Sequence, residues 1–259
     1  MARNQLRIVS LAPNVTSILH ALDATNHLVG VSRWCKDVAP IASLPTVGDC
    51  WRLNVSEVMK LRPTLLIGSV PFAIETVEDI LAQPVAFLAI NPRSLADIER
   101  DIRTLARLVG RAAAGERLIS KMKRAFDNVK KKAAAARRHQ SRRTFRPVVY
   151  AEAWPNPRIS SPPWVAELIE HVGGISAVPA GAQVSDDEVA RAKPDIIVLA
   201  WTATGDRAKL ETALKNPSWR DVPAILSRCV YVIRDEWLNT PGPPLIQGAE
   251  TLFRAIWKK

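Results

Sequence analysis

The chain has 259 residues, of which 47% are hydrophobic and 24% charged, so it can bury a sizeable core as one large domain or as two lobes. No apolar run reaches the roughly 18 residues that a membrane-spanning helix needs, and three cysteines at irregular spacing define no disulfide framework. The net charge of +11 would suit a polyanionic partner, but its position along the chain decides how it is interpreted.

Strand-like and helix-like segments alternate through the first 110 residues. The apolar run LRIVSL stops before Pro13, and Asn14 is expected to cap the helix that follows. Strands are predicted over residues 6–11, 28–31, 65–67 and 85–90, and helices over residues 15–22, 55–61, 72–82 and 94–109. Residues 32–49 contain two prolines and are predicted to form a loop. This alternation predicts a parallel sheet with helices on both faces.

A single long helix is predicted over residues 111–143. The segment has no proline and is rich in Ala, Lys, Arg, Glu and Leu, which favour helices. One apolar stripe recurs at helical spacing: Leu118, Ile119, Met122, Phe126 and Val129. About 28 helical residues would span roughly 40 Å, which is longer than a small lobe needs. The helix is therefore expected to join two lobes, residues 1–110 and 144–259.

Most of the net charge lies on this predicted helix. Residues 116–143 contain eleven Lys or Arg and two acids, a net charge of +9 that leaves about +2 for the rest of the chain. The basic face is interpreted as solvated, with a polyanion or an anionic membrane as the alternative partner. No aromatic residue except Phe126 interleaves with the basic ones, so the pattern does not favour a nucleic-acid stacking platform.

The alternation resumes after the long helix. Strands are predicted over residues 147–151, 196–200 and 230–233, and helices over residues 164–171, 186–192, 207–215 and 245–257. Residues 153–163, AWPNPRISSPP, are proline-rich and are predicted to form a loop, as are residues 235–240. The second half therefore also predicts an α/β lobe.

One short unit recurs in both halves. Residues 57–63 (EVMKLRP) lead into the strand LLI, and residues 188–194 (EVARAKP) lead into the strand IIV. In each, a short helix ends at a basic residue and a proline, and a strand follows. The recurrence predicts two similar α/β lobes with a cleft between them, into which loops after the strands of both lobes point.

Five of the eight tryptophans lie in these expected loops: Trp34, Trp51, Trp154, Trp201 and Trp237. Tryptophan offers a large flat apolar face and one N–H donor, so several together suit a large, flat, partly apolar ligand. For each one alone, packing in the core or in a loop is the alternative interpretation. The other three, Trp164, Trp219 and Trp257, lie in or beside predicted helices and are interpreted as structural.

The sequence carries no recognisable catalytic motif, so a binding protein is favoured over an enzyme and no catalytic residue is predicted. There is no GxSxG, no glycine-rich phosphate loop and no HExxH. The four histidines are scattered and are interpreted as surface or packing residues: His20, His27, His139 and His171. Cys35, Cys50 and Asp49 could form a soft metal site, but no histidine lies in the same loops, and no metal site is predicted.

Six segments of the chain occur in a recognisable order: RIVSLAPNVTSIL, LVGVSRWC, LPTVGD, EVMKLRPTLLIG, WVAELIEHVGG and VSDDEVARAKPDIIVLA. Together they resemble, over essentially the whole chain, the substrate-binding proteins of ABC importers for cobalamin and iron-siderophores. GVSRWC and the proline-rich loop near Trp154 are most similar to the cobalamin-binding branch. The resemblance implies two Rossmann-like lobes with mainly parallel sheets joined by one long α-helix. It also implies a ligand held between the lobes and little hinge closure.

The resemblance also implies roles for particular residues. Eight match loops that the family uses for its ligand: Trp34, Cys35, Asp49, Trp51, Trp154, Trp201, Glu236 and Trp237. Glu75 and Asp187 match the acid on each lobe that docks onto arginines of the membrane permease. A solvated helix acid is the alternative for each, and Asp187 has a shorter reach than the Glu usual in the family.

The favoured function is capture of a cobalamin-like corrinoid and its delivery to the permease and ATPase of an ABC importer, by a monomeric protein with no cofactor of its own. Haem or a ferric siderophore is the alternative ligand. The alternative of another class is a cytosolic protein that binds nucleic acid or anionic membrane through its basic helix. The resemblance implies a periplasmic or cell-envelope location. No signal peptide is visible in this sequence, so we expect either a leader outside it or a cytoplasmic protein.

Overall fold

The computed structural model describes residues 6–41, 43–49, 51–138 and 146–257. These residues form two compact units. The first comprises the chain up to Pro92 together with Ala96–Ser120, and the second comprises Arg93–Leu95 together with the chain from Lys121 onward. Each unit contains its own sheet. No helix within the described ranges is long and apolar enough to cross a membrane.

The sheet of the first unit is entirely parallel, as its alternating pattern predicts. Its strands lie in the order β3-β2-β1-β4-β5. Their bounds are β1 (Ile8–Ser10), β2 (Leu28–Ser32), β3 (Thr46–Val47), β4 (Leu65–Ser69) and β5 (Ala86–Ile90). β1 lies at the centre, where Ile8 and Val9 are completely buried, because a strand with helices on both faces must be apolar on both.

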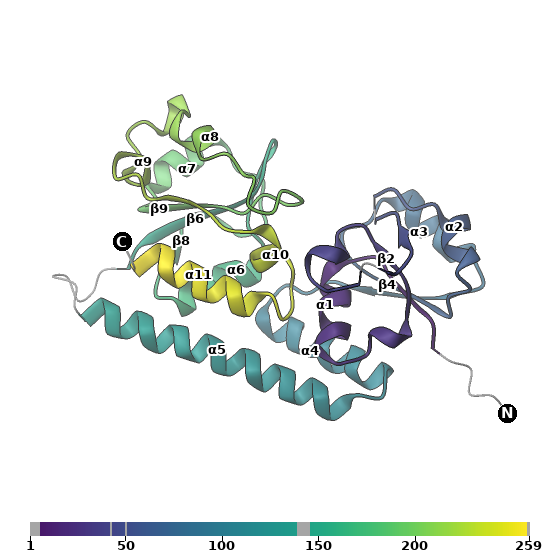
Figure 1. Cartoon of the computed structure of the whole chain (residues 1–259). Coiled ribbons are helices and arrows are strands. Elements are labelled where there is room, and N and C mark those ends of the chain that lie inside the picture. Colours follow the sequence, from purple (N-terminus) through teal and green to yellow (C-terminus); the bar gives the residue numbers. More distant parts are fainter. Residues whose placement is uncertain (1–5, 42, 50, 139–145, 258–259) are drawn as a thin grey trace. The chain divides into compact units, whose positions relative to one another are not determined.

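Four helices accompany this sheet: α1 (Pro13–Ala21), α2 (Val55–Lys60), α3 (Ile74–Leu81) and α4 (Leu95–Leu108). α2 and α3 contact each other (Figure 1). The predicted cap of the first helix is wrong. Ala12 is the N-cap, and Asn14 lies inside the first turn and is buried, because Pro13 occupies the first helical position, which its fixed φ favours.

The loop predicted over residues 32–49 is also wrong in part. It contains a short 3₁₀ helix, η2 (Cys35–Asp37), and the edge strand β3; a second 3₁₀ helix, η1 (Thr25–His27), precedes β2. β3 has only two residues and pairs through Val31 with Thr46 and Ser32 with Val47. Such a short strand lacks the periodic pattern by which strands are recognised in a sequence.

The predicted long helix is present as α5 (Ala112–Arg138). Residues 139–143 of the prediction lie outside the described residues. The predicted apolar stripe is confirmed, because Leu118, Ile119, Met122, Phe126 and Val129 are all buried. The first turns of α5 belong to the first unit, and the helix from Lys121 onward belongs to the second. The predicted lobe boundaries at residues 110 and 144 stay predictions.

The sheet of the second unit is built around β6 (Val148–Pro155). β9 (Ile196–Leu199) and β8 (Ile175–Ser176) pair parallel with it, and β10 (Val230–Val232) pairs parallel with β9. β7 (Arg158–Ser160) pairs antiparallel with the end of β6, so the loop predicted over residues 153–163 is wrong. Asn156 and the cis-proline after it form the tight turn of this hairpin, so the prolines mark the turn and its flanks and leave the strands intact.

Helices cover both sides of this sheet. α6 (Pro163–His171) and α11 (Leu245–Trp257) lie on one side, and α7 (Asp186–Ala192), α8 (Leu210–Leu214) and α9 (Pro223–Leu226) lie on the other (Figure 1). A 3₁₀ turn, η3 (Pro217–Trp219), contacts α7. The loop predicted over residues 235–240 is largely a short helix, α10 (Asp235–Asn239), with two acids in its first turn, where the helix dipole favours negative charge.

The recurring unit of the sequence is present in both sheets. α2 leads into β4, and α7 leads into β9. In each case the basic residue before the proline adopts a left-handed conformation: φ is +48° at Arg62 and +46° at Lys193. The same backbone turn thus feeds an equivalent strand next to the central one. The predicted fold class is confirmed: two α/β lobes with mainly parallel sheets, joined by one long helix.

Candidate ligand-binding site

Asp49 is the centre of a loop cluster in the first unit. Arg33 and Trp34 follow β2, and Asp49 follows β3, so both loops begin at the carboxyl ends of neighbouring parallel strands. The Asp49 carboxylate accepts hydrogen bonds from Arg33 Nη2 at 2.8 Å and from Trp34 Nε1 at 3.2 Å. It also accepts hydrogen bonds from the backbone N–H groups of Trp51 and Arg52, each at 3.1 Å. One carboxylate therefore fixes two loops.

The surroundings of Asp49 keep it charged. Burial alone would raise the pKa of this carboxyl, but the hydrogen bonds from Arg33, Trp51 and Trp34 outweigh burial and hold the pKa below its usual value. The guanidinium carbon of Arg33 also lies 5.1 Å from the centre of the Trp34 ring, a cation–π contact. Trp34 is thus held on its edge by Asp49 and on its face by Arg33.

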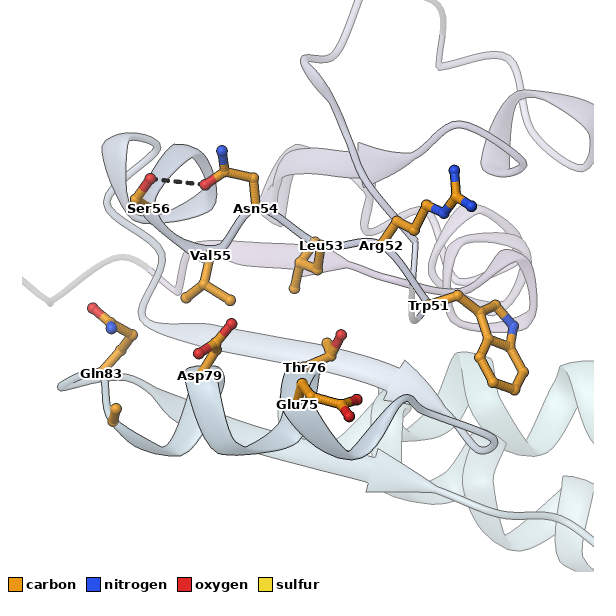
Figure 2. A pocket seen from close by; sticks show the side chains of 11 residues that line it. Trp51, Arg52, Leu53, Asn54, Val55, Ser56, Glu75, Thr76, Asp79 and Gln83 are labelled. Atoms are coloured by element: carbon orange, nitrogen blue, oxygen red, sulfur yellow. Dashed lines mark hydrogen bonds between the residues drawn. The ribbon is translucent and has the colours of Figure 1, made fainter.

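Trp51 is the most exposed of the tryptophans predicted to bind ligand, with 61% of its surface exposed. It lies at one end of a cavity of about 750 Å³ (Figure 2). Trp51–Ser56 line one side, with Leu53 and Val55 pointing toward α3, and Glu75, Thr76, Asp79 and Gln83 line the other. A predicted ligand residue, Trp51, and a predicted docking residue, Glu75, therefore border the same cavity.

Cys35 lies in the core of the first unit, with no exposed surface. Its sulfur accepts a hydrogen bond from the Thr16 hydroxyl at 3.0 Å and lies 3.2 Å from Ser32 Oγ. Burial raises the pKa of the Cys35 thiol, and the hydrogen bonds only partly offset this. The side chain packs beneath the loop of Trp34 and, in this structure, has no surface to offer a ligand. Cys50 lies outside the described residues, and within them no cluster of His, Cys, Asp or Glu could hold a metal.

Glu152 is the centre of a buried network in the second unit. It lies on β6, and its residue is completely buried. Trp201 donates its indole N–H to Glu152 Oε1 at 2.8 Å, and Tyr150 donates its hydroxyl to Oε2 at 2.7 Å. Arg158, on β7, forms an ion pair with Oε2. Three donors thus converge on one carboxylate. Trp201, which follows β9, is held by this bond in the core, where only 8% of its surface is exposed.

The partners of Glu152 are themselves held in place. Arg158 also donates to Asp186 Oδ1 at 2.9 Å, and its guanidinium lies 4.4 Å from the centre of the Trp219 ring. Burial opposes the charge on Arg158, but Glu152 outweighs burial and raises the pKa of this guanidinium. Burial and the Glu152 carboxylate likewise raise the pKa of Tyr150, so its hydroxyl stays a donor.

Trp154 marks the exposed end of β6. The residue is 41% exposed, and its indole N–H donates to the Asn156 carbonyl at 2.8 Å within the hairpin turn. That bond orients the ring by using its only donor, so the face of the ring is what remains for a ligand.

Asp235 connects the two remaining loops of the second unit. Its carboxylate, largely buried, accepts the backbone N–H of Ala203 at 2.9 Å and of Gly205 at 2.6 Å, which ties the loop after β9 to α10. Burial raises the pKa of Asp235, partly offset by these N–H groups. Next to it, Glu236 Oε1 accepts a hydrogen bond from Arg234 at 3.1 Å, and its buried Oε2 has no hydrogen-bond partner in the described structure.

Trp237 is half-buried beside this pair, and the Arg234 guanidinium lies 6.0 Å from the centre of its ring. Glu236 and Trp237 thus form a carboxylate and aromatic pair on α10, with an arginine next to both. The arrangement has the same components as the Asp49, Trp34 and Arg33 group of the first unit.

The two predicted docking acids are exposed and lie in the first turns of helices. Glu75 lies on α3. Asp187 lies between two acids that are engaged: Asp186 binds Arg158, and Glu188 completes a capping box with Ser185. No hydrogen bond or ion pair of Asp187 occurs in the described part of the chain, so its carboxylate is available to a partner.

Sequence reasoning missed the residues that hold the tryptophans in place, chiefly Arg33, Glu152 and Asp235. Glu152 left a usable signal, because a carboxylate inside the apolar run VVYAEAW must find buried donors. Arg33 and Asp235 left none, since charged residues in loops are ordinary.

The chain has relatives among known proteins. A family model described as periplasmic binding protein matches residues 8–237. The chain is 25% identical to an uncharacterized ABC transporter substrate-binding lipoprotein, YvrC, of Bacillus subtilis, in an alignment that covers 97% of this chain and 80% of the relative. It is 22% identical to the vitamin B12-binding protein of Pectobacterium atrosepticum, over 95% and 86% of the two chains.

A solved structure supports the same grouping. The periplasmic heme-binding protein RhuT from Roseiflexus sp. RS-1 is similar with a TM-score of 0.78 and 26% identity, over 98% of each chain. The family model spans most of the sequence, from β1 to the start of α10, and so includes the sheets of both lobes. The chain belongs to the periplasmic binding protein family and is a small-molecule-binding protein that works with the permease and ATPase of an ABC importer, not an enzyme.

Proposed function

We propose that the ligand is a cobalamin-like corrinoid, bound by exposed aromatic side chains and the polar groups beside them. The observation that carries the proposal is the exposure of Trp51 in the first unit and Trp154 in the second, at 61% and 41%. Trp51 follows β3, where Asp49 accepts a hydrogen bond from its backbone N–H, and Trp154 lies at the end of β6, where the Asn156 carbonyl accepts a hydrogen bond from its indole N–H. Large exposed aromatic faces suit a broad macrocycle edged with apolar groups.

The polar groups beside the tryptophans fit the amide side chains of a corrinoid. In the described structure the Glu236 carboxylate accepts a hydrogen bond from Arg234 on Oε1 and none on its buried Oε2, so rotation of this side chain would give an amide N–H a free acceptor. Asp49, Arg33 and Trp34 form a matching acceptor and donor group in the first unit. The predicted roles of Trp34, Asp49, Trp51, Trp154, Glu236 and Trp237 are therefore direct contacts. Cys35 and Trp201 support them from the core.

A corrinoid is favoured over haem because the two differ in whether the protein must supply a ligand to the bound metal. Haem iron in proteins is usually held by His, Cys, Met or Tyr. In the described parts of the segments that carry Trp34, Trp51, Trp154 and Trp237, no such side chain is exposed, since Cys35 is wholly buried. A corrinoid brings ligands for its own cobalt and needs no such residue. The vitamin B12-binding relative supports the same choice.

Haem is the second candidate. The structurally similar RhuT is a heme-binding protein, and Arg33, Arg52 and Arg234 lie where they could pair with the carboxylates of a porphyrin.

Titration of the protein with cyanocobalamin, cobinamide and haemin, followed by tryptophan fluorescence, tests the ligand. We expect quenching at micromolar corrinoid. Trp51→Ala and Trp154→Ala should each weaken binding by about tenfold, because each removes one stacking face worth roughly 1 kcal/mol or more. Trp257→Phe is the matched control, since it also removes one tryptophan but lies in α11, away from the loops.

Two results would overturn the proposal. One is no quenching by either corrinoid at micromolar concentration while haemin binds. The other is equal corrinoid affinity of the Trp51, Trp154 and Trp257 variants, which would place the ligand elsewhere.

We also propose that Glu75 and Asp187 dock the protein onto arginines of the permease. Their exposure in first helical turns and the unengaged carboxylate of Asp187 support this role. In proteoliposomes that contain the cognate permease and ATPase, Glu75→Gln with Asp187→Asn should reduce stimulation of ATP hydrolysis and leave ligand affinity unchanged. Glu78→Gln with Glu211→Gln, one exposed acid per unit, is the matched control. Equal stimulation by both double variants would refute the assignment.

We further propose that the protein acts as a monomer in the periplasm or on the cell envelope, as the family and the lipoprotein relative suggest. Cell fractionation and size-exclusion chromatography would test this. Recovery from the cytoplasmic fraction would overturn the location, and a dimer would overturn the monomer.

A further inference from the structure

The part of α5 in the second unit carries a straight basic stripe. Lys121, Arg124, Lys131 and Arg138 are exposed and follow one another at spacings of three or seven residues. Residues at these spacings lie on one face of a helix. With a rise of about 1.5 Å per residue, the stripe is roughly 25 Å long.

The stripe has almost no compensating charge. Residues 121–138 contain eight Lys or Arg and a single acid, Asp127. No ion pair of Lys121, Arg124, Lys131 or Arg138 occurs in the described part of the chain. Lys132, one residue away, behaves differently. It pairs with Glu250 at 2.8 Å and lies 5.9 Å from the centre of the Phe253 ring, so it helps hold α5 to α11.

The opposite face of the helix is fixed in the core of the unit. Met122, Phe126, Val129 and Ala133 are buried, and the Phe126 ring lies 6.3 Å from that of His171. The helix cannot rotate its basic stripe away without exposing this apolar face. The stripe is therefore a rigid row of cations held away from the core.

We infer that this stripe is a docking surface for anionic phospholipid headgroups. A straight row of Lys and Arg without aromatic residues matches a flat anionic surface, where recognition needs charge and no base stacking. The only aromatic side chain of the segment, Phe126, is buried, so single-stranded nucleic acid would find no stacking face. A protein that serves a membrane permease gains encounters from such contact, because it then searches for its partner in two dimensions.

The expected effect follows from the number of charges. Near an anionic membrane surface each Lys or Arg raises the partition coefficient by about fivefold. Replacing Lys121, Arg124 and Lys131 by Gln should therefore lower it by about a hundredfold. Gln has nearly the helix propensity of Lys and Arg, so the fold of α5 should not change. The binding should also weaken strongly when salt is raised from about 0.01 M to about 0.15 M, as the Debye length falls.

Co-sedimentation of the full chain with vesicles tests the inference. Vesicles of phosphatidylcholine with about 30% phosphatidylglycerol should bind the protein, and vesicles of phosphatidylcholine alone should not. The variant K121Q/R124Q/K131Q should lose the binding. The matched control K209Q/K215Q/R228Q removes three exposed charges from other elements of the same unit and should bind more than tenfold better than that variant.

Three results would overturn the inference: no binding to anionic vesicles at low salt, equal loss in both triple variants, or tighter binding to a short DNA duplex than to the vesicles. Far-ultraviolet circular dichroism and thermal unfolding check that both variants are folded. The outcome is separable from that of the corrinoid proposal, because none of these residues lies in the tryptophan loops and ligand titration is read independently.

Discussion

Replacing Glu152 by Gln tests whether the buried network of the second unit is as strong as its geometry implies. Glu152 accepts from three donors: the Trp201 indole, the Tyr150 hydroxyl and the Arg158 guanidinium. Glutamine has the same shape but only one acceptor oxygen, and its NH₂ group can only donate. Whichever way the amide turns, it points a donor at another donor and leaves Arg158 without its buried counter-charge.

The cost can be estimated from the partners that remain. Removing one partner of a buried ion pair typically costs about 3–5 kcal/mol. Arg158 keeps its second bond to Asp186, at 2.9 Å, and its stacking on Trp219, so the lower end of about 3 kcal/mol is expected. For a chain of this size that corresponds to a fall in Tm of about 6–12 °C.

Urea unfolding followed by tryptophan fluorescence measures the loss. The double variant Glu152→Gln with Arg158→Met removes the uncompensated charge while keeping a side chain to pack on Trp219. It should lose at least 0.5 kcal/mol less than the sum of the single variants, by the usual coupling of contacting charges. Glu57→Gln breaks only the exposed pair with Lys60 and should cost less than about 0.5 kcal/mol.

A loss below about 1 kcal/mol in Glu152→Gln would refute this reasoning, because it would mean that the three donors find other acceptors. Exact additivity in the double variant would refute the claim that Glu152 and Arg158 act as a pair.

Three further changes have defined outcomes. Asp49→Asn should lower the free energy of unfolding by about 1–2 kcal/mol and weaken ligand binding, because an amide cannot accept hydrogen bonds from all the donors that join the two loops. The stability that Asp49 provides is present above about pH 4 and is lost as pH falls through its lowered pKa. Unfolding measured as a function of pH should therefore show a difference between the natural chain and the variant that disappears in acid. Burial raises the pKa of Asp101 to about 6, so this acid favours folding most below about pH 4, and that contribution is lost as pH rises through 6. At pH 7 the free energy of unfolding of Asp101→Asn should therefore exceed that of the natural chain, by at most about 3 kcal/mol and by about half that after solvent screening. A difference between the two proteins that is the same at pH 4 and pH 7 would contradict this prediction. Gly248→Ala would press a methyl group onto the Trp237 carbonyl, so it should cost about 1–3 kcal/mol and lower ligand affinity by displacing α10, whereas unchanged affinity would mean that α10 is not a ligand contact.

The sequence was sufficient for the main elements because most of them have a clear period. The long helix from Ala112, the parallel strands and the repeated helix, basic residue, proline and strand unit all follow from apolar spacing and helix stops. The elements it missed are short. β3 and β8 have two residues each, and the β6–β7 hairpin is hidden by the prolines at its turn and flanks. A local pattern of two or three residues carries too little information to compete with a loop.

For the candidate site, residue type could be predicted and environment could not. Trp51 and Trp201 look alike in the sequence, yet one is 61% exposed and the other lies in the core with its indole on Glu152. Which of them faces solvent depends on a carboxylate 49 residues away in the chain. Cys35 shows the same point, because only the packing of Thr16 and Ser32 around its sulfur removes it from the surface. Long-range partners of this kind leave no spacing signature.

Asp235 and Glu236 are adjacent acids with opposite tolerance to change. The Asp235 carboxylate accepts hydrogen bonds from the backbone N–H groups of Ala203 and Gly205, so any replacement loosens both α10 and the loop after β9. Glu236 and Trp237 lie on α10, the helix that Asp235 holds in place. Selection for a new ligand can therefore explore residues 236 and 237 freely while residue 235 stays constant. A combinatorial library for altered specificity would hold Asp235 fixed and randomise Glu236 and Trp237.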